Sequence, residues 1–582
     1  MRKPFYEIIR LLFLTIFLAS CLPQPGSVGP DGIQLPPMEI PLREFPTSQP
    51  MAASIETPVA TQPDLSLATA TLPDPQLPGP TPTITPLPYP LRVDSSVPDA
   101  LRNEALAWNL PPAETASESR LELGLADPTD QTRITWTYAL VVPFPTLLDG
   151  VSLDELKSAW ENPLTGPLAG SQLIMTESTL GAFTALFGEA GVGSVKTVAE
   201  GRLVDALWEN QPAWGIVPFE SLDPKLKVLT IDGQSPISND FDEGEYPLKI
   251  DFSLTGNVAG SFELPSANRD PSKLTVVLMT GVTALVRATA VRMEIVEIEY
   301  PAWNIGDTLR AADITHISNE VPFAKGCPYP DPRQKDLVFC SNPKYIELLE
   351  LIETDVVELT GNHFQDYGSE ATLYTLEMYN DRHWPYYGGG ADLEDAREPA
   401  LLTHNGNRFA FIGCNPVGPA LAWATEDQPG AAPCGDYEWM KAEIASLSEK
   451  GYIVIATFQY IEYYEPLPTE QHVSDFRAIA DAGATIVNGS QAHIPQAMEF
   501  YEDGFIHYGL GNLFFDNMAG PARREFLDQH VFYEGRYIST ELITAMLEDY
   551  ARPRLMTPEE RNVFLESMFE VSGWQGNESS SE

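Results

Sequence analysis

The stretch Val356–Gly368 has the sequence VVELTGNHFQDYG, and it decides the fold class of this chain. Its first residues form an apolar, β-prone run, and polar side chains that can bind a metal or a phosphate follow directly after Gly361. A buried strand of an α/β sheet presents a site at its carboxyl end in this way. The stretch therefore predicts an α/β fold with a site at this strand end.

A second stretch, far downstream, has the same design. Ile486–His493 has the sequence IVNGSQAH, in which an apolar run again leads into a glycine and then a histidine. Two strand ends of the same design, far apart in the chain, predict one composite site.

The length and the net charge of the chain limit the classes of function that it can have. The 582 residues are too many for a single hydrophobic core, and about two or three domains are expected. The formal net charge of −47 argues against nucleic acid as a partner, because phosphate binding needs basic patches. An acidic surface is compatible with an exported protein, although the charge alone decides no function.

The N-terminus carries a more specific pattern. Arg2 and Lys3 precede an apolar run over residues 8–18, and Ala19-Ser20-Cys21 follows it. This resembles a bacterial lipoprotein signal, in which a cysteine after small residues is lipidated. The run is short for a membrane span, so we expect a signal peptide over 1–21, a lipid on Cys21 and a place on the outer face of the cell membrane. An ordinary cleaved signal peptide and a plain anchor helix are the alternatives.

The other cysteines are even in number, which suggests disulfide bonds in an exported chain. Of the three connectivities, we prefer the pairing of sequence neighbours, Cys327 with Cys340 and Cys414 with Cys434. A cysteine metal site is the alternative, but no spacing is the short CxxC of zinc sites.

Residues 22–92 are rich in Pro, Thr, Ser and Gln. Such a stretch cannot bury enough apolar surface to offset its ordering entropy, so it predicts a disordered tether.

Short apolar strands alternate with helices over residues 93–270. Examples are the strand 138–145, the helix 153–160 and the strand 214–219. The alternation predicts an α/β layer structure, and its order resembles a periplasmic solute-binding protein of the phosphate-binding type. The resemblance implies a binding or protein-contact role, and a structural spacer is the alternative. The first histidine of the chain is His316, so no histidine-based active site is expected here.

A second α/β unit is predicted over residues 271–570, and a disordered acidic tail over 571–582. Expected strands lie at 273–280, 312–320, 408–413 and 452–458, and expected helices at 345–351, 370–380 and 476–482.

Four blocks of this unit stand in a fixed order: Thr360–Gly368, Gly389–Pro399, Gly489–His493 and Tyr508–Asp516. Together they resemble the CapA family of poly-γ-glutamate capsule-synthesis proteins, over about residues 272–520. The resemblance implies a four-layer α-β-β-α sandwich similar to calcineurin-like metallophosphatases, with metals at the strand ends. It also implies a role in making, releasing or anchoring an extracellular polyanion or polysaccharide, within a capsule-synthesis complex.

The resemblance assigns roles to individual residues. Glu320 stands where the family has the acidic residue of its second strand, and His493 matches the last histidine of the final block. Glu320, Asn362 and His493 are the implied metal ligands, and His363 is the implied general acid, paired with Asp366 or Glu320. Such donors suit Mn, Fe or Zn, which polarise a phosphoryl or acyl group and activate water.

Three departures oppose simple metallohydrolase chemistry. Val282 stands where the family has an aspartate after the first strand, and Gln459 stands where it has a histidine. Ser490 and Gln491 replace the first histidine of the final block. The loss of one anionic and two imidazole ligands would weaken a dinuclear metal site severely.

Two hypotheses follow. The site is either a rebuilt hydrolase or transferase site, or a non-catalytic pocket that binds an acidic polymer or sugar through amides and histidines. Helix capping by Asn362 and Asp366 is the purely structural alternative. The expected substrate contacts are Gln459, Glu462, Ser490, Gln491 and Asn512. The histidines expected only to pack or to lie at the surface are His316, His383, His404, His472, His507 and His530.

Overall fold

The computed structural model describes residues 89–161, 166, 167 and 169–574. The predicted signal peptide, Cys21 and residues 22–88 of the predicted tether lie outside the described residues, as does the tail from residue 575. The first strand, β1 (Leu91–Val93), begins inside the predicted tether. Across the described ranges, no helix combines the length and the apolar character that crossing a membrane requires.

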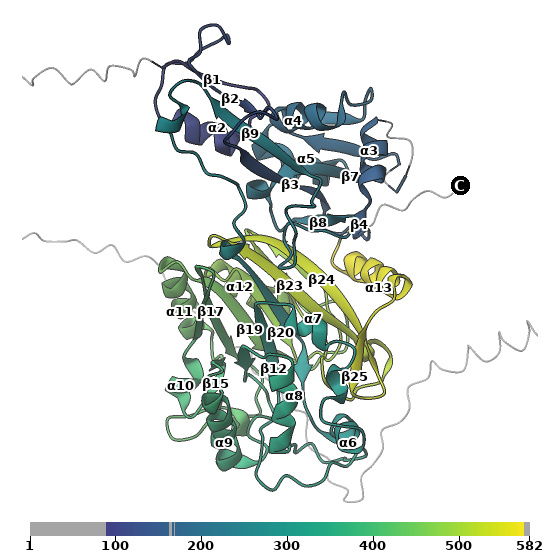
Figure 1. Cartoon of the computed structure of the whole chain (residues 1–582). Helices are drawn as coiled ribbons and strands as arrows, with labels where there is room; N and C mark the ends of the chain where they lie inside the picture. The colour runs from purple at the N-terminus through teal and green to yellow at the C-terminus, as the bar shows by residue number, and fades with distance from the viewer. Residues whose placement is uncertain (1–88, 162–165, 168, 575–582) are drawn as a thin grey trace, which may run out of the picture. The chain divides into compact units, whose positions relative to one another are not determined.

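The first sheet is formed by strands between residues 91 and 255 (Figure 1). Its order is β1-β2-β9-β3-β7-β5-β6, with β8 beside β3 and β4 beside β8. The further strands are β2 (Leu121–Leu125), β3 (Ile134–Pro143), β4 (Gly150–Val151), β5 (Gln172–Met175), β6 (Val195–Thr197), β7 (Ala213–Pro218), β8 (Leu226–Ile231) and β9 (Lys249–Thr255). The helices are α2 (Asp99–Leu106), α3 (Leu153–Glu161), α4 (Glu177–Phe187) and α5 (Leu203–Glu209).

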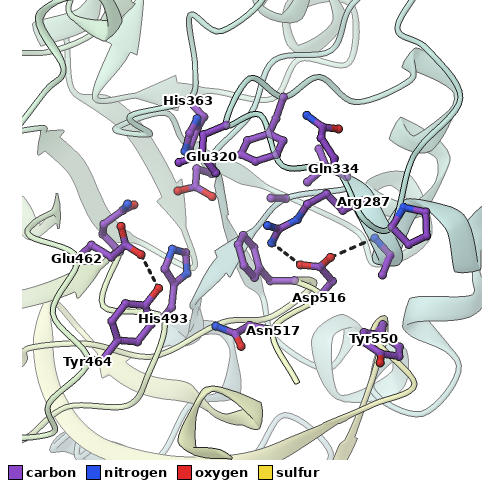
Figure 2. A pocket seen from close by; sticks show the side chains of 18 residues that line it. Arg287, Glu320, Gln334, His363, Glu462, Tyr464, His493, Asp516, Asn517 and Tyr550 are labelled. Carbon is purple, nitrogen blue, oxygen red and sulfur yellow. Dashed lines mark hydrogen bonds and ion pairs between the residues drawn. The ribbon is translucent and has the colours of Figure 1, made fainter. Parts of the chain in front are cut away.

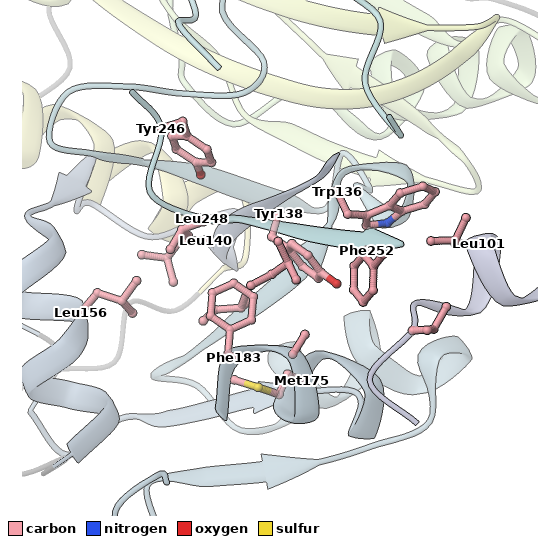
Figure 3. Close-up of a cluster of buried hydrophobic side chains, with 14 of the residues drawn as sticks. Leu101, Trp136, Tyr138, Leu140, Leu156, Met175, Phe183, Tyr246, Leu248 and Phe252 are labelled. Atoms are coloured by element: carbon pink, nitrogen blue, oxygen red, sulfur yellow. The ribbon is translucent and has the colours of Figure 1, made fainter. Parts of the chain in front are cut away.

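Strand β3 is buried on both faces, because its apolar residues alternate between two hydrophobic clusters. Tyr138 and Leu140 pack with Phe183 of α4 (Figure 3), whereas Val141 packs with Leu207 of α5. A strand with two apolar faces belongs in the middle of a layered α/β structure.

Two further sheets carry the second half of the chain. One has the order β14-β13-β12-β10-β23-β24-β25, with β11 beside β12, and the other has the order β16-β17-β19-β20-β22-β21. The strands of the former are β10 (Leu274–Thr280), β11 (Val282–Thr283), β12 (Ile314–Asn319), β13 (Val356–Glu358), β14 (Tyr386–Tyr387), β23 (Arg524–Tyr533), β24 (Arg536–Glu548) and β25 (Arg552–Leu555). Those of the latter are β16 (Ala400–His404), β17 (Asn407–Cys414), β19 (Ile453–Gln459), β20 (Ile486–Ser490), β21 (Met498–Tyr501) and β22 (Gly504–His507). Strands β15 (Gly389–Gly390) and β18 (Gly430–Ala431) form a small separate pair.

These two sheets pack on each other, and helices cover their outer faces. Val277 and Met279 of β10 share one cluster with Phe411 of β17, whereas Leu278 packs outward against α6, α8 and α9. Helices α11 and α12 cover the outer face of the other sheet. The helices of this half are α6 (Arg287–Ile295), α7 (Gly306–Arg310), α8 (Ile346–Leu351), α9 (Gly368–Asp381), α10 (Leu393–Arg397), α11 (Glu438–Glu449), α12 (Glu470–Asp481) and α13 (Pro558–Val571). The protein is thus a mixed α/β protein with several sheets.

The predicted boundary near residue 270 is not a break in packing. The ring of Phe144, which follows β3, lies 4.9 Å from Phe500 and 5.5 Å from Trp574 between centroids. Arg561 of α13 donates a 2.7 Å hydrogen bond to Asp149. The described residues accordingly belong to one compact unit. Because α13 extends to Val571 and Trp574 packs against it, the predicted tail begins too early.

Candidate functional site

A pocket of about 420 Å³ lies at the carboxyl ends of strands from both packed sheets (Figure 2). Glu320 follows β12, His363 follows β13, Glu462 follows β19 and His493 follows β20, and all four line it. The two distant strand ends that the sequence singled out therefore meet at one pocket. It is further lined by Ala284, Val286, Arg287, Ala288, Pro332, Gln334, Leu337, Phe339, Tyr464, Gln491, Phe515, Asp516, Asn517 and Tyr550.

His363 forms a dyad with Asp366. Its Nδ1 donates to Asp366 Oδ2 at 2.7 Å, and the backbone N–H of Phe339 donates to the same oxygen at 2.7 Å. Burial alone lowers the pKa of His363, but the hydrogen bond to Asp366 and the charges of Glu320, Asp366 and Glu462 outweigh it and raise the pKa above its ordinary value. Helix α9 begins without a side-chain cap, so Asn362 and Asp366 are not capping residues.

Glu320 is buried and is held by a network of amides. Gln459 Nε2 donates to Glu320 Oε1 at 3.0 Å. Gln459 Oε1 accepts hydrogen bonds from the backbone N–H of Asn362 and, at 3.1 Å, from Asn415 Nδ2. Gln459 thus stands behind the pocket and orients Glu320, because both ends of its amide are fixed.

His493 is held in a strained backbone conformation. Its φ is +54°, and that of Gln491 is +79°, in a region that non-glycine residues rarely adopt. The imidazole is fixed because its Nδ1 donates a 2.9 Å hydrogen bond to Asn512 Oδ1, and Phe515 stacks on it with 4.6 Å between the ring centroids. Beside it, Tyr464 donates a hydrogen bond to Glu462.

Arg287 and Asp516 form a wall that sequence reasoning missed. They make an ion pair, and the backbone N–H of Ala288 donates to Asp516 Oδ2 at 3.1 Å. The guanidinium lies 5.3 Å from the ring centroid of Phe339 and 5.4 Å from that of Phe515. The only signal in the sequence was the position of each residue directly after an apolar run.

Most of the predicted site residues fall into two groups. Those that line the pocket are Glu320, His363, Glu462, Gln491 and His493. Those that support the lining from behind are Asp366, Gln459 and Asn512. Ser490 instead donates to the backbone oxygen of Phe458 at 3.2 Å.

The donor set does not fit the metal centre that the family resemblance implies. Nowhere in the described ranges are three or more His, Cys, Asp or Glu side chains arranged to hold a metal ion. One oxygen of Glu320 already accepts from Gln459, and Val282 offers no ligand atom. Asn362 Oδ1 is a predicted ligand atom that is still free to bind a metal, since it is buried and no described residue donates a hydrogen bond to it.

Both predicted disulfides are confirmed: Cys327 is bonded to Cys340 and Cys414 to Cys434. The first closes a loop that supplies Pro332, Gln334, Leu337 and Phe339 to the pocket wall. A cross-link therefore constrains the segment that packs on His363.

Comparison with known proteins finds similarity over the part of the chain that supplies most of this pocket. Residues 260–517 match the model of the family "Bacterial capsule synthesis protein PGA_cap". The capsule biosynthesis protein CapA of Bacillus anthracis is 31% identical over 164 residues, which are 28% of this chain and 40% of that protein. The PGA biosynthesis protein CapA of Bacillus subtilis (strain 168) is 27% identical over 224 residues, 38% of this chain and 58% of that protein. The chain thus spans about half the length of these relatives.

An ABC-type phosphate transport receptor from Vibrio cholerae aligns with 29% of this chain and 86% of its own, at 13% identity. Its TM-score of 0.24 is too low to carry an argument about the fold. The match over residues 260–517 confirms the resemblance to CapA: this part of the chain is similar to the PGA_cap family of bacterial capsule synthesis proteins.

Proposed function

We propose that this chain takes part in assembling an extracellular polymer of the poly-γ-glutamate or polysaccharide class, by binding a polymer segment in the pocket. The names of its relatives support this role, since they are described as capsule and PGA biosynthesis proteins. Because the chain spans only part of each relative, the polymer and any capsule-synthesis complex are parts of the proposal.

The hydrogen bond from Gln459 to Glu320 is the observation that favours a binding function over metal chemistry. At this place the family resemblance expects a histidine whose ring nitrogen would face a metal. The amide of Gln459 instead directs an N–H at the carboxylate and fixes it. A buried array of satisfied hydrogen bonds gives a rigid surface for recognition.

Calorimetric titration of the full chain with short γ-glutamyl oligomers tests this proposal. The wild type is expected to bind, and His363→Ala to bind about tenfold more weakly or worse, because a charge-assisted contact is lost. His383→Ala is the matched control, since His383 is exposed and does not line the pocket. Equal affinity for both histidine variants, or no binding by the wild type, would overturn the proposal.

Metal-assisted hydrolysis or transfer is the second candidate, and the unpartnered Oδ1 of Asn362 favours it. Elemental analysis of the full chain separates the two. Stoichiometric Mn, Fe or Zn that disappears in an Asn362→Ala, His493→Ala variant would replace the binding proposal. A protein free of these metals before and after substitution leaves the binding proposal standing.

The proposal includes a lipid on Cys21 and a place on the outer face of the cell membrane, which the N-terminal sequence supports. It also includes a solute-binding-like first domain and a metallophosphatase-like second domain. Cys21→Ala is expected to move the protein from the membrane fraction to the medium. Retention of this variant in the membrane fraction would contradict the lipid anchor.

A further inference from the structure

The pocket is more negative than a polyanion-binding site should be. Its wall holds three carboxylates, those of Glu320, Glu462 and Asp516, against one permanent cation, Arg287, and the imidazoles of His363 and His493. The whole chain adds a net charge of −47, so a run of ligand carboxylates would be repelled. A ligand that binds here must therefore bring a positive charge of its own.

The charges are also divided in space. In Figure 2, Glu320 and Glu462 lie on one side of the pocket near the two histidines, and Arg287 lies on the other side beside Asp516. Glu320 Oε1 accepts a hydrogen bond from Gln459, and Glu462 Oε1 accepts one from Tyr464. No described residue donates a hydrogen bond to the second oxygen of either carboxylate. Two carboxylates with open oxygens suit an ammonium group, which has several N–H donors.

Arg287 supplies the opposite recognition element. Its side chain keeps 24% of its surface exposed, and it is held between two aromatic rings and by Asp516. A guanidinium has five N–H donors, and the ion pair with Asp516 uses its Nη2. Its planar fork matches the geometry of a ligand carboxylate.

We infer that the pocket binds the zwitterionic amino terminus of an acidic oligomer, its ammonium between Glu320 and Glu462 and its carboxylate at Arg287. This rests on the proposed function and narrows it to a chain end. A γ-linked glutamyl chain presents this pair of groups, because its first residue keeps a free α-ammonium and a free α-carboxylate on one carbon. An α-linked chain has the ammonium, but its α-carboxyl group is consumed in the amide bond.

The test compares three dipeptides on the full chain by calorimetry: γ-Glu-Glu, α-Glu-Glu and N-acetyl-γ-Glu-Glu. We expect γ-Glu-Glu to bind about tenfold or more tightly than either of the others. The acetylated dipeptide lacks the ammonium, and the first residue of α-Glu-Glu carries its free carboxylate at the end of the side chain instead of on the α-carbon. Equal binding of the acetylated and free γ-dipeptides would overturn the inference while leaving polymer binding intact. Failure of all three dipeptides and of longer γ-glutamyl oligomers would overturn the proposed function as well.

Glu462 and Glu465 are exposed residues of one loop, and their substitution gives a test variant and a matched control. Glu462→Gln is expected to lose about tenfold in affinity for γ-Glu-Glu and to leave that for the acetylated form unchanged. Glu465→Gln, whose carboxylate does not line the pocket, is expected to bind as the wild type does. An equal loss in both variants, or a loss in neither, would refute the placement of the ammonium. Arg287→Gln should remove the preference for γ-Glu-Glu over α-Glu-Glu, and its persistence would refute the placement of the carboxylate.

Discussion

Gln459 donates a 3.0 Å hydrogen bond to the buried carboxylate of Glu320, although the two residues are 139 positions apart in the chain. We expect Gln459→Met, which keeps the length but not the polar atoms, to lower the free energy of unfolding by about 3 kcal/mol. The reason is that Glu320, Asn415 and the backbone N–H of Asn362 each lose a partner. Urea unfolding measures this loss.

Gln428→Met is the control for that substitution, because, among the described residues, the Gln428 side chain makes only a solvent-exposed hydrogen bond, to the backbone oxygen of Leu421. It should change the free energy of unfolding by less than about 0.5 kcal/mol. If the two variants were equally stable, the amide network would not be the element that holds Glu320.

The burial of the Glu525 carboxyl group predicts that the stability of the protein depends on pH. Both of its carboxylate oxygens are buried without a partner among the described residues, and burial raises its pKa well above the usual value. A carboxyl group whose folded pKa exceeds its unfolded pKa contributes stability below the unfolded pKa, and this contribution is lost as the pH rises towards the folded pKa. We expect Glu525→Gln to remove that loss, so that the variant gains up to about 1.4 kcal/mol over the wild type for each pH unit above about 4.3.

Urea unfolding of both proteins at about pH 5 and about pH 8 measures the effect of Glu525→Gln, within the window that the raised pKa opens. A stability difference that stays constant between the two pH values would mean that Glu525 has the same pKa in the folded and unfolded states.

The Cys327–Cys340 disulfide is expected to matter for binding as well as for stability. A Cys327→Ser, Cys340→Ser variant should lose about 3 kcal/mol of unfolding free energy, because the unfolded chain gains freedom. It should also bind γ-Glu-Glu more weakly, since the loop carries Phe339, whose ring lies 4.9 Å from His363. Calorimetry under conditions where near-UV circular dichroism shows a folded variant separates the two effects, and unchanged affinity would show that the loop does not shape the pocket.

Phe144→Ala tests whether the two halves of the chain unfold together. Phe144 is 3% exposed and packs against rings from the far half of the chain, so its truncation should cost about 3–5 kcal/mol. Thermal unfolding should remain a single transition at a lower temperature, whereas two separate transitions would contradict a shared core. Leu186→Ala is the control, because Leu186 is 44% exposed and its loss should be small.

The sequence predicted the strands that lead into the pocket, because an apolar run that ends in glycine marks a buried strand and its carboxyl end. It predicted neither β23 and β24 nor α13, whose packing against distant parts of the chain leaves little local signal. Arg287 was missed for a similar reason. Its φ of +45° and its partner Asp516, 229 residues away, are tertiary features.

The rings around Phe144 have a consequence for how this protein can evolve. Residues from the first half, the packed sheets and the last helix complete one aromatic cluster. A gene fusion that joined a different first half to the part of the chain that resembles PGA_cap would leave these rings facing water. The two halves therefore depend on each other for the burial of these rings, and a substitution in either half changes the contacts available to the other.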